Sequence, residues 1–151
     1  MENDKTLLEN LIKEVENILP ANPKYELYSE QWYVNAPDVA GCYFVWEGEH
    51  LVYIGETGNL RKRMRDLKNT LNHTLRRKIG SAMFSYHPEY KPASSKRKFT
   101  ETIEQGITNY CKTHLTVSYI PLTIGRKEVE ETFLNRNPKP KYNSPSYRRG
   151  V

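Results

Sequence analysis

The chain has 151 residues, of which 37% are hydrophobic, and a formal net charge of +5. This suits one domain with a single core and leaves little room for two. Its two cysteines, Cys42 and Cys111, are too few for a disulfide scaffold or a four-cysteine zinc site. Every apolar run is far shorter than a membrane span, and the polar segment 1–5 lacks the pattern of a signal peptide, so we expect a cytoplasmic protein.

The first predicted element is a helix over residues 6–19. Thr6 and Glu9 are spaced as in a capping box, apolar residues follow at helical spacing, and Pro20 ends the run. The apolar face of this helix must pack on the rest of the domain or on a second subunit, which leaves a homodimer open. Residues 21–38 contain two prolines and several aromatics, and they predict an irregular arm.

Three short strands are predicted. Residues 42–46 and 51–54 are rich in β-branched and aromatic side chains, and the turn at 47–50 indicates that they form a hairpin. Residues 116–120 have a similar composition and end before Pro121, which favours a third strand.

Helices are predicted on both sides of the third strand. Two apolar stripes at helical spacing follow the hairpin, the first over residues 60–71 and the second over 71–83. The stretch 84–98 is aromatic, basic and proline-containing, and it indicates a loop in which Ser94 or Ser95 can cap the next helix. A last short helix is expected over about residues 127–135.

In this order the elements predict an α+β fold. We expect a small three-stranded antiparallel sheet flanked by helices, with an extra N-terminal helix. Residues 1–40 are expected to form a helix and an arm that pack on the core, residues 41–143 to form the main domain, and residues 144–151 to form a basic C-terminal tail.

Basic charge is concentrated in two parts of the chain. Residues 61–78 contain eight Lys and Arg against the single acid Asp66, and the part after Arg136 contains four cations and no acid. Such a distribution is typical of a protein that binds a phosphate backbone. Charge alone does not separate this interpretation from a solvated helix face followed by a basic tail.

Five short motifs follow one another along the chain. Gly41-Cys42-Tyr43 precedes Tyr53-Ile54-Gly55 by ten residues, and Gly55 to Arg63 has the spacing Gly-x-x-x-Asn-Leu-x-x-Arg. Glu131 and then Pro140-Lys141-Tyr142-Asn143 complete the series. Together they resemble the signature of the GIY-YIG nucleases. The resemblance implies a GIY-YIG nuclease domain over residues 41–143 that cleaves DNA with one divalent cation, Mg²⁺ or Mn²⁺, bound by Glu131.

The residue types also suit phosphodiester hydrolysis, which needs an activated water and relief of charge on the phosphate oxygens. Arg63 can hold the phosphate with a planar fork of donors, and Glu131 is a hard oxygen ligand for Mg²⁺. Tyr43 and Tyr53 would lie on adjacent strands, where their hydroxyls can converge on the attacking water. A phenol has a pKa of about 10. A nearby cation favours its anion, which makes Tyr43 a candidate general base.

Ordinary structural roles are the alternative for each of these side chains. The two tyrosines can be cross-strand packing residues, and the arginine can be a solvated helix cation. For the metal ligand, Glu128 and Glu130 compete with Glu131. The family spacing favours Glu131, which lies twelve residues before Asn143.

Two positions depart from the family pattern. Some relatives have an aromatic residue or a histidine one helical turn after the motif arginine, where this chain has Leu67. His73 is a candidate replacement as a catalytic residue, and a phosphate contact or a position next to a helix start is its alternative. Glu56 stands where several relatives carry Lys, and we expect an acid there either to weaken nonspecific attraction to DNA or to turn outward.

DNA contacts are expected around the turn after the hairpin and along the basic segment. The predicted substrate-binding residues are Gly55, Asn59, Arg61, Lys62, Arg76, Arg77 and Asn143. The rival interpretation is a catalytically silent nucleic-acid-binding module with the same fold. Loss of Glu131 or Arg63 would mark such a module, and both residues are present.

Overall fold

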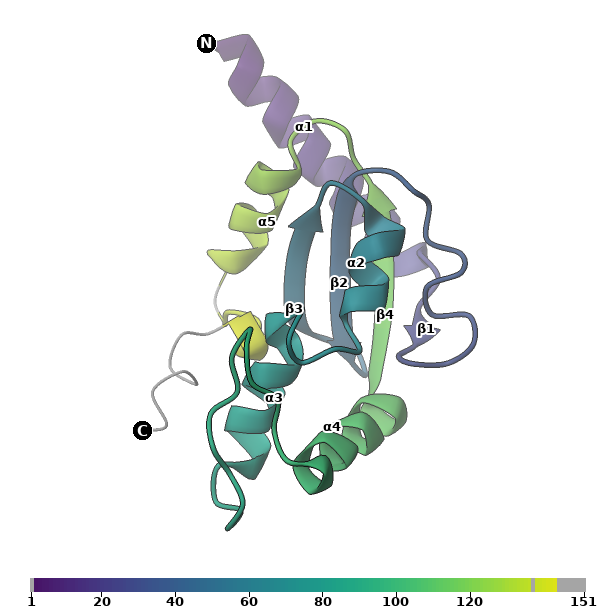
Figure 1. Ribbon diagram of the computed structural model, residues 1–151. Helices are drawn as coiled ribbons and strands as arrows, with labels where there is room; N and C mark the ends of the chain where they lie inside the picture. The colour runs from purple at the N-terminus through teal and green to yellow at the C-terminus, as the bar shows by residue number, and fades with distance from the viewer. Residues whose placement is uncertain (1, 137, 144–151) are drawn as a thin grey trace.

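The computed structural model describes residues 2–136 and 138–143 (Figure 1), so the predicted basic tail at 144–151 lies outside the described residues. The elements in chain order are α1 (Glu2–Ile18), the 3-10 turn η1 (Leu19–Ala21), β1 (Tyr25–Glu26), β2 (Gly41–Glu47), β3 (His50–Thr57), α2 (Leu60–Asp66), α3 (Thr74–Phe84), α4 (Glu101–His114), β4 (Leu115–Pro121), α5 (Arg126–Leu134) and the 3-10 turn η2 (Lys141–Asn143).

The sheet is antiparallel throughout and has the order β1-β4-β2-β3. The three predicted strands correspond to β2, β3 and β4, and the α+β fold with flanking helices and an extra N-terminal helix is confirmed. β1 is an addition, in which Tyr25 of the predicted irregular arm pairs with Val117. Two residues are too few for an alternating pattern to appear in the sequence. β3 forms one edge of the sheet.

Alternation along the strands divides the core between the two faces of the sheet. Tyr43, Val45 and Tyr53 belong to the larger apolar cluster, which is shared with α2, α3 and α4. Phe44 and Ile54 belong to the smaller cluster, which is shared with α1 and α5. Figure 1 shows α2 in front of the strands and α1 behind them, with α3 and α4 gathered at the lower end of the sheet. Because β3 is an edge strand, helices on both faces can reach its free side.

The C-terminal half of α1 packs on the smaller cluster. Val15 and Leu19 are buried there, and Leu11 and Ile12 are partly buried beside them, whereas Leu7 is 66% exposed. The apolar face of α1 is therefore covered within the chain over part of its length. Neither α1 nor any other helix in the described part of the chain is long and apolar enough to cross a membrane.

The helix predicted over residues 60–71 is shorter in the structure. α2 ends at Asp66, and the segment 67–73 forms turns before α3 begins. The Asn69 side chain accepts a hydrogen bond from the backbone of Leu71, and the backbone N–H of His73 donates to the Asn69 carbonyl. This reversal brings His73 back to the sheet. α4 also begins later than predicted, at Glu101 and not after the serines of the loop.

Candidate active site

Two tyrosines lie side by side on the face of the sheet that α2, α3 and α4 cover. Tyr43 on β2 is opposite Gly55 on β3, and Tyr53 is opposite Val45, so the two ring centroids are 6.2 Å apart. Gly55 makes this arrangement possible, because a Cβ at that position would overlap the Tyr43 ring. The motif glycine therefore lets the phenol lie across β3, and its contact with substrate stays a prediction.

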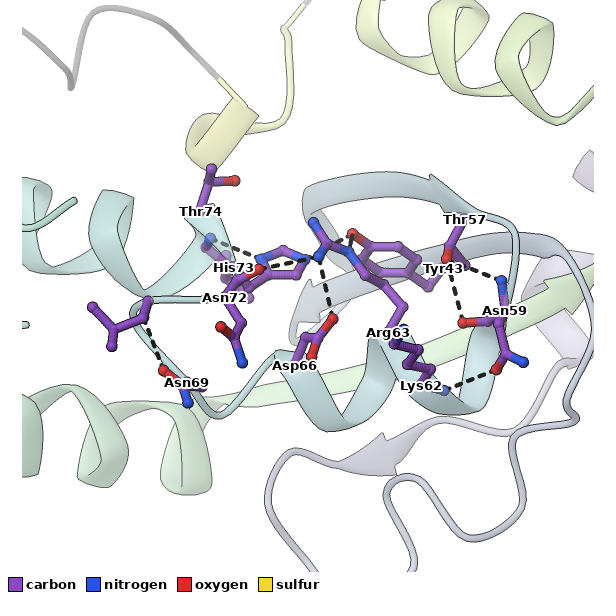
Figure 2. Close-up of polar contacts among 12 residues, drawn as sticks. Tyr43, Thr57, Asn59, Lys62, Arg63, Asp66, Asn69, Asn72, His73 and Thr74 are labelled. Carbon is purple, nitrogen blue, oxygen red and sulfur yellow. Dashed lines mark hydrogen bonds and ion pairs between the residues drawn. The ribbon is translucent and has the colours of Figure 1, made fainter. Parts of the chain in front are cut away.

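Arg63 reaches this pair from α2 (Figure 2). Its Nε donates a long hydrogen bond of 3.4 Å to Tyr43 Oη, and its Nη1 donates to the Asn72 carbonyl at 3.1 Å and to Asp66 Oδ2 at 3.4 Å. The guanidinium is thus held over the phenol by one side chain and one main-chain carbonyl. It remains 30% exposed, so part of it faces solvent.

His73 meets Tyr43 from the start of α3. It is the N-cap of that helix: its Nδ1 accepts a hydrogen bond from the backbone N–H of Leu75 at 2.9 Å. An acceptor nitrogen carries no proton, so the proton of the neutral ring is on Nε2. Nε2 lies 2.7 Å from Tyr43 Oη and therefore donates to it. The helix cap fixes the tautomer that the Tyr43 contact requires.

Tyr43 Oη consequently accepts hydrogen bonds from both Arg63 and His73. Burial raises the pKa of Tyr43, and the charge of Arg63 opposes that rise. The pKa of His73 is well below its usual value because the ring is buried and because Arg63 and Arg77 lie nearby. At neutral pH Tyr43 and His73 are therefore both neutral, beside the guanidinium of Arg63.

The buried neutral His73 predicts a loss of stability in acid. Below about pH 6.5 the unfolded chain protonates this histidine while the folded chain does not, so each further pH unit costs about 1.4 kcal/mol of unfolding free energy. His73→Asn keeps a cap acceptor without the titration. Urea unfolding between pH 5 and pH 7 should show a shallower pH dependence for that variant. Equal slopes for the two proteins would contradict a buried neutral His73.

Tyr53 is 7% exposed and has a polar partner on α3. Its hydroxyl is 3.1 Å from Thr74 Oγ1, at the first residue of α3. Burial raises the pKa of Tyr53, and the charge of Glu130 adds a smaller contribution in the same direction. Tyr43, Tyr53, Arg63 and His73, which were all predicted as catalytic, are thus brought together from β2, β3, α2 and the start of α3.

The predicted metal ligand Glu131 is not joined to this group by any contact among the described residues. Its side chain is exposed on α5. The described part of the chain also contains no cluster of three or more His, Cys, Asp or Glu side chains that could hold a metal ion. A divalent cation here would therefore have few protein ligands and would be coordinated mainly by water and phosphate oxygens.

Two asparagines predicted to contact substrate have structural partners. Asn143 clamps the edge strand, since its Oδ1 accepts from the Ile54 N–H at 2.9 Å and its Nδ2 donates to the Ile54 carbonyl at 3.0 Å. Asn59 is the N-cap of α2, and its Oδ1 accepts from the backbone N–H of Lys62 at 2.9 Å. The first amide fixes η2 on β3, and the second orients the helix that carries Arg63.

The four predicted DNA-binding cations have different surroundings. Arg76 is only 3% exposed and pairs with Glu104 at 2.8 Å, so its prediction as a substrate contact is wrong. Arg61 donates to Asp38 and to two carbonyls of the segment 21–38, which it ties to α2. Lys62 is exposed. Arg77 is half-buried beside His73 and lines a pocket of about 270 Å³.

Sequence reasoning missed the residues that orient the predicted ones. Asp66 and the Asn72 carbonyl hold Arg63, and Thr74 meets Tyr53. Asp66 was recognisable as the single acid of the basic segment, three residues after Arg63. Asn72 and Thr74 carried no such signal, because their positions depend on the turn between α2 and α3.

A buried pair of strand tyrosines, with an arginine and a histidine on one phenol oxygen, is a candidate catalytic site. The family model described as the GIY-YIG catalytic domain matches residues 41–144, which is more than half of the chain. The chain belongs to this GIY-YIG family, a family of nucleases.

Similarity to individual proteins is weaker. No curated protein matches the chain. Two solved structures of the N-terminal GIY-YIG endonuclease domain of UvrC from Thermotoga maritima are 17% and 18% identical to it, and each comparison covers 74% of this chain and 90% of the other, with a TM-score of 0.39. Both are tyrosine-to-phenylalanine mutants bound to a catalytic divalent cation.

Proposed function

We propose that this chain is an endonuclease that hydrolyses DNA phosphodiester bonds with a divalent cation, Mg²⁺ or Mn²⁺. The observation that supports this most strongly is the environment of Tyr43 Oη, which accepts hydrogen bonds from Arg63 and from neutral His73. Two donors on one phenol oxygen favour its anionic form. Packing alone requires neither donor, whereas a general base requires an oxygen that can hold negative charge.

In the proposed mechanism Tyr43 is the general base. The phenolate accepts a proton from the attacking water, and the resulting hydroxide forms the new P–O bond as the bond to the leaving oxygen breaks. His73 acts as a positioning residue that donates to the phenolate through Nε2 and keeps its tautomer through the α3 cap. Tyr53, held by Thr74, would lie on the other side of the water.

Positive charge near the phosphate has two sources. The solvent-facing part of Arg63 can donate to a non-bridging phosphate oxygen while Nε stays on Tyr43. A divalent cation bound by a carboxylate of α5 would neutralise charge on the phosphate and favour the phenolate. The phenolate needs this stabilisation, because burial raises the pKa of Tyr43 when neither DNA nor a cation is bound. We therefore propose that the site becomes active only when DNA and cation are both bound.

The test is cleavage of supercoiled plasmid by the purified chain with Mg²⁺, with Mn²⁺ and with EDTA. We expect nicked or linear product with either cation and none with EDTA. Arg63→Gln should lower the cleavage rate by about 10²-fold or more, as loss of a transition-state donor does. Lys112→Gln, which removes an exposed cation at the end of α4, should cleave like the wild type.

The proposal fails if the wild-type chain binds DNA with the usual salt dependence but produces no cut under any of these conditions. That result would favour the silent nucleic-acid-binding module. An Arg63→Gln variant that cleaves at the wild-type rate would also contradict the proposed site.

A further inference from the structure

Three glutamates on α5 are close enough in sequence to compete for the cation. Helical geometry separates them, because successive residues turn by about 100°. Val129 and Phe133 are buried and mark the side of α5 that faces the sheet. Glu130 lies about 60–100° from these two residues around the helix, whereas Glu131 lies about 160° from both. Glu131 therefore points away from the sheet.

The observed burial agrees with this phase. Arg126, Glu130 and Leu134 form one row at i, i+4 and i+8, and all three are half-buried. The neighbouring row, Lys127, Glu131 and Asn135, is exposed throughout. Of these two rows, only the first is partly covered by the rest of the domain, so of Glu130 and Glu131 only Glu130 lies where a carboxylate can reach the edge of the sheet.

An ion pair fixes the first row against the edge strand. Arg126 Nε donates to Glu56 Oε2 at 2.7 Å, near the end of β3. Glu130 lies one turn further along the same row, and its carboxyl interacts with the backbone of Glu56. Among the described residues Glu130 forms no ion pair, since Arg126 is engaged by Glu56. Glu130 is half-buried, with the carboxylate of Glu56 on one side and the charge of Lys127 also nearby.

The same carboxyl is electrostatically coupled to the tyrosine pair. Glu130 contributes to the raised pKa of Tyr53, whose ring stacks 6.2 Å from that of Tyr43. α5 lies on the opposite face of the sheet from these rings, but β3 is the edge strand, so a side chain of α5 can pass around its free side. Asn143 already occupies that free edge at Ile54, two residues before Glu56.

We infer that Glu130, and not Glu131, is the carboxylate of α5 that binds the divalent cation of the proposed nuclease site. This inference rests on the proposed function for the presence of a cation, and on the α5 geometry for the choice of residue. A half-buried carboxylate that forms no ion pair and has a second acid beside it is stabilised by a divalent ion. An exposed carboxylate that is fully hydrated gains much less. With Glu130 as the ligand, Asn143 follows the metal ligand by thirteen residues in this chain, one more than the twelve that favoured Glu131.

The experiment measures Mn²⁺ binding by the full chain, with free Mn²⁺ followed by electron paramagnetic resonance, for the wild type and for Glu130→Gln, Glu131→Gln and Glu128→Gln. We expect Glu130→Gln to weaken Mn²⁺ binding at least tenfold. Glu131→Gln and Glu128→Gln should stay within twofold of the wild type. Weakening by Glu131→Gln with Glu130→Gln unaffected, or equal weakening by both, would overturn the inference.

Thermal unfolding provides a second readout that keeps folding and binding separate. A ligand that binds only the folded state raises its Tm. Saturating Mn²⁺ should therefore raise the Tm of the wild type and of Glu131→Gln but not that of Glu130→Gln. Without metal, Glu130→Gln should unfold at or above the wild-type temperature, because it removes a charge next to Glu56. A Mn²⁺-induced rise of wild-type size in Glu130→Gln would contradict the inference.

Failure of the nuclease proposal would look different. If Mn²⁺ binding depends on Glu130 as stated but the wild-type chain cuts no plasmid, the cation site stands and the proposed function falls. If the wild-type chain cuts plasmid with Mn²⁺ and Glu130→Gln binds the ion as well as the wild type does, the function stands and the choice of Glu130 falls.

Discussion

Replacing Tyr43 by phenylalanine is expected to lower the rate of DNA cleavage by about 10³-fold, within the range that general-base catalysis contributes. The substitution removes only Oη, so the ring still packs beside Tyr53 and against Gly55. It leaves Arg63 and His73 without their common acceptor. Single-turnover cleavage under saturating Mg²⁺ measures the rate, and a gel shift at fixed salt measures DNA binding, which should change less than threefold.

Tyr86→Phe is the matched control, because it removes a phenol oxygen from an 81% exposed side chain in the 84–98 loop. It should cleave at the wild-type rate. A Tyr43→Phe variant that folds, binds DNA and retains more than a tenth of wild-type cleavage would show that another group accepts the proton. His73 would not be that group, since its Nδ1 is occupied by the α3 cap and its Nε2 carries the proton.

Arg76→Met is expected to lower the free energy of unfolding by about 3–5 kcal/mol, the usual cost of removing one partner of a buried ion pair. Arg76 donates to the carboxylate and to the backbone carbonyl of Glu104, and also to Thr70 and Tyr28. Loss of the guanidinium leaves the carboxylate of Glu104, a side chain that is 16% exposed, without its cation. Urea unfolding measures the change, and Lys62→Gln on exposed α2 surface should change it by less than about 0.5 kcal/mol.

A second substitution distinguishes an unpaired charge from a simple loss of packing. Glu104→Gln in the Arg76→Met background removes the stranded carboxylate while keeping a polar side chain for Thr70. The double variant should therefore be more stable than Arg76→Met alone. If the loss of unfolding free energy in the double variant equals the sum of the losses in Arg76→Met and in Glu104→Gln, the two side chains act independently. The buried pair then does not explain the role of Arg76.

The strands and the family were readable from the sequence because their signals are local. β2, β3 and β4 consist of β-branched and aromatic runs bounded by turn residues, and the motif from Gly55 to Arg63 spans one turn and one helix start. Tyr43, Tyr53 and Arg63 are brought close together by these local elements, and Asp66, the Asn72 carbonyl and Thr74 then orient their polar groups. Their predicted convergence therefore depended on little more than the pairing of two strands and the entry into α2.

Other site residues depended on tertiary structure that no local pattern shows. His73 reaches Tyr43 because the chain reverses between α2 and α3, where the sequence favoured a helix up to residue 71. Arg76 and Arg77 are adjacent and identical in type, yet one is buried against Glu104 and the other lines a surface pocket. Charge patterning predicted both as DNA contacts, because it cannot register which side of α3 faces α4.

The choice between Glu130 and Glu131 illustrates a third kind of limit. A motif spacing counts residues across the segment between α5 and η2, where one added residue changes the count without moving the helix. The helical phase set by Val129 and Phe133 is independent of that segment. Sequence reasoning could have used these apolar positions, and it would then have placed Glu130 nearer to the sheet.

The most direct test of the proposed function is cleavage of plasmid DNA by the wild-type chain with Mg²⁺ in water enriched in ¹⁸O. The label shows whether a solvent water attacks the phosphorus atom, as the proposed site around Tyr43 requires. Attack by one solvent water predicts one ¹⁸O atom in the phosphate that each cut leaves on one of its two new ends, and none in the hydroxyl of the other end, detected by mass spectrometry of a short cleavage product. Cut ends without the label, or bound DNA that stays intact with either cation, would contradict hydrolysis at this site.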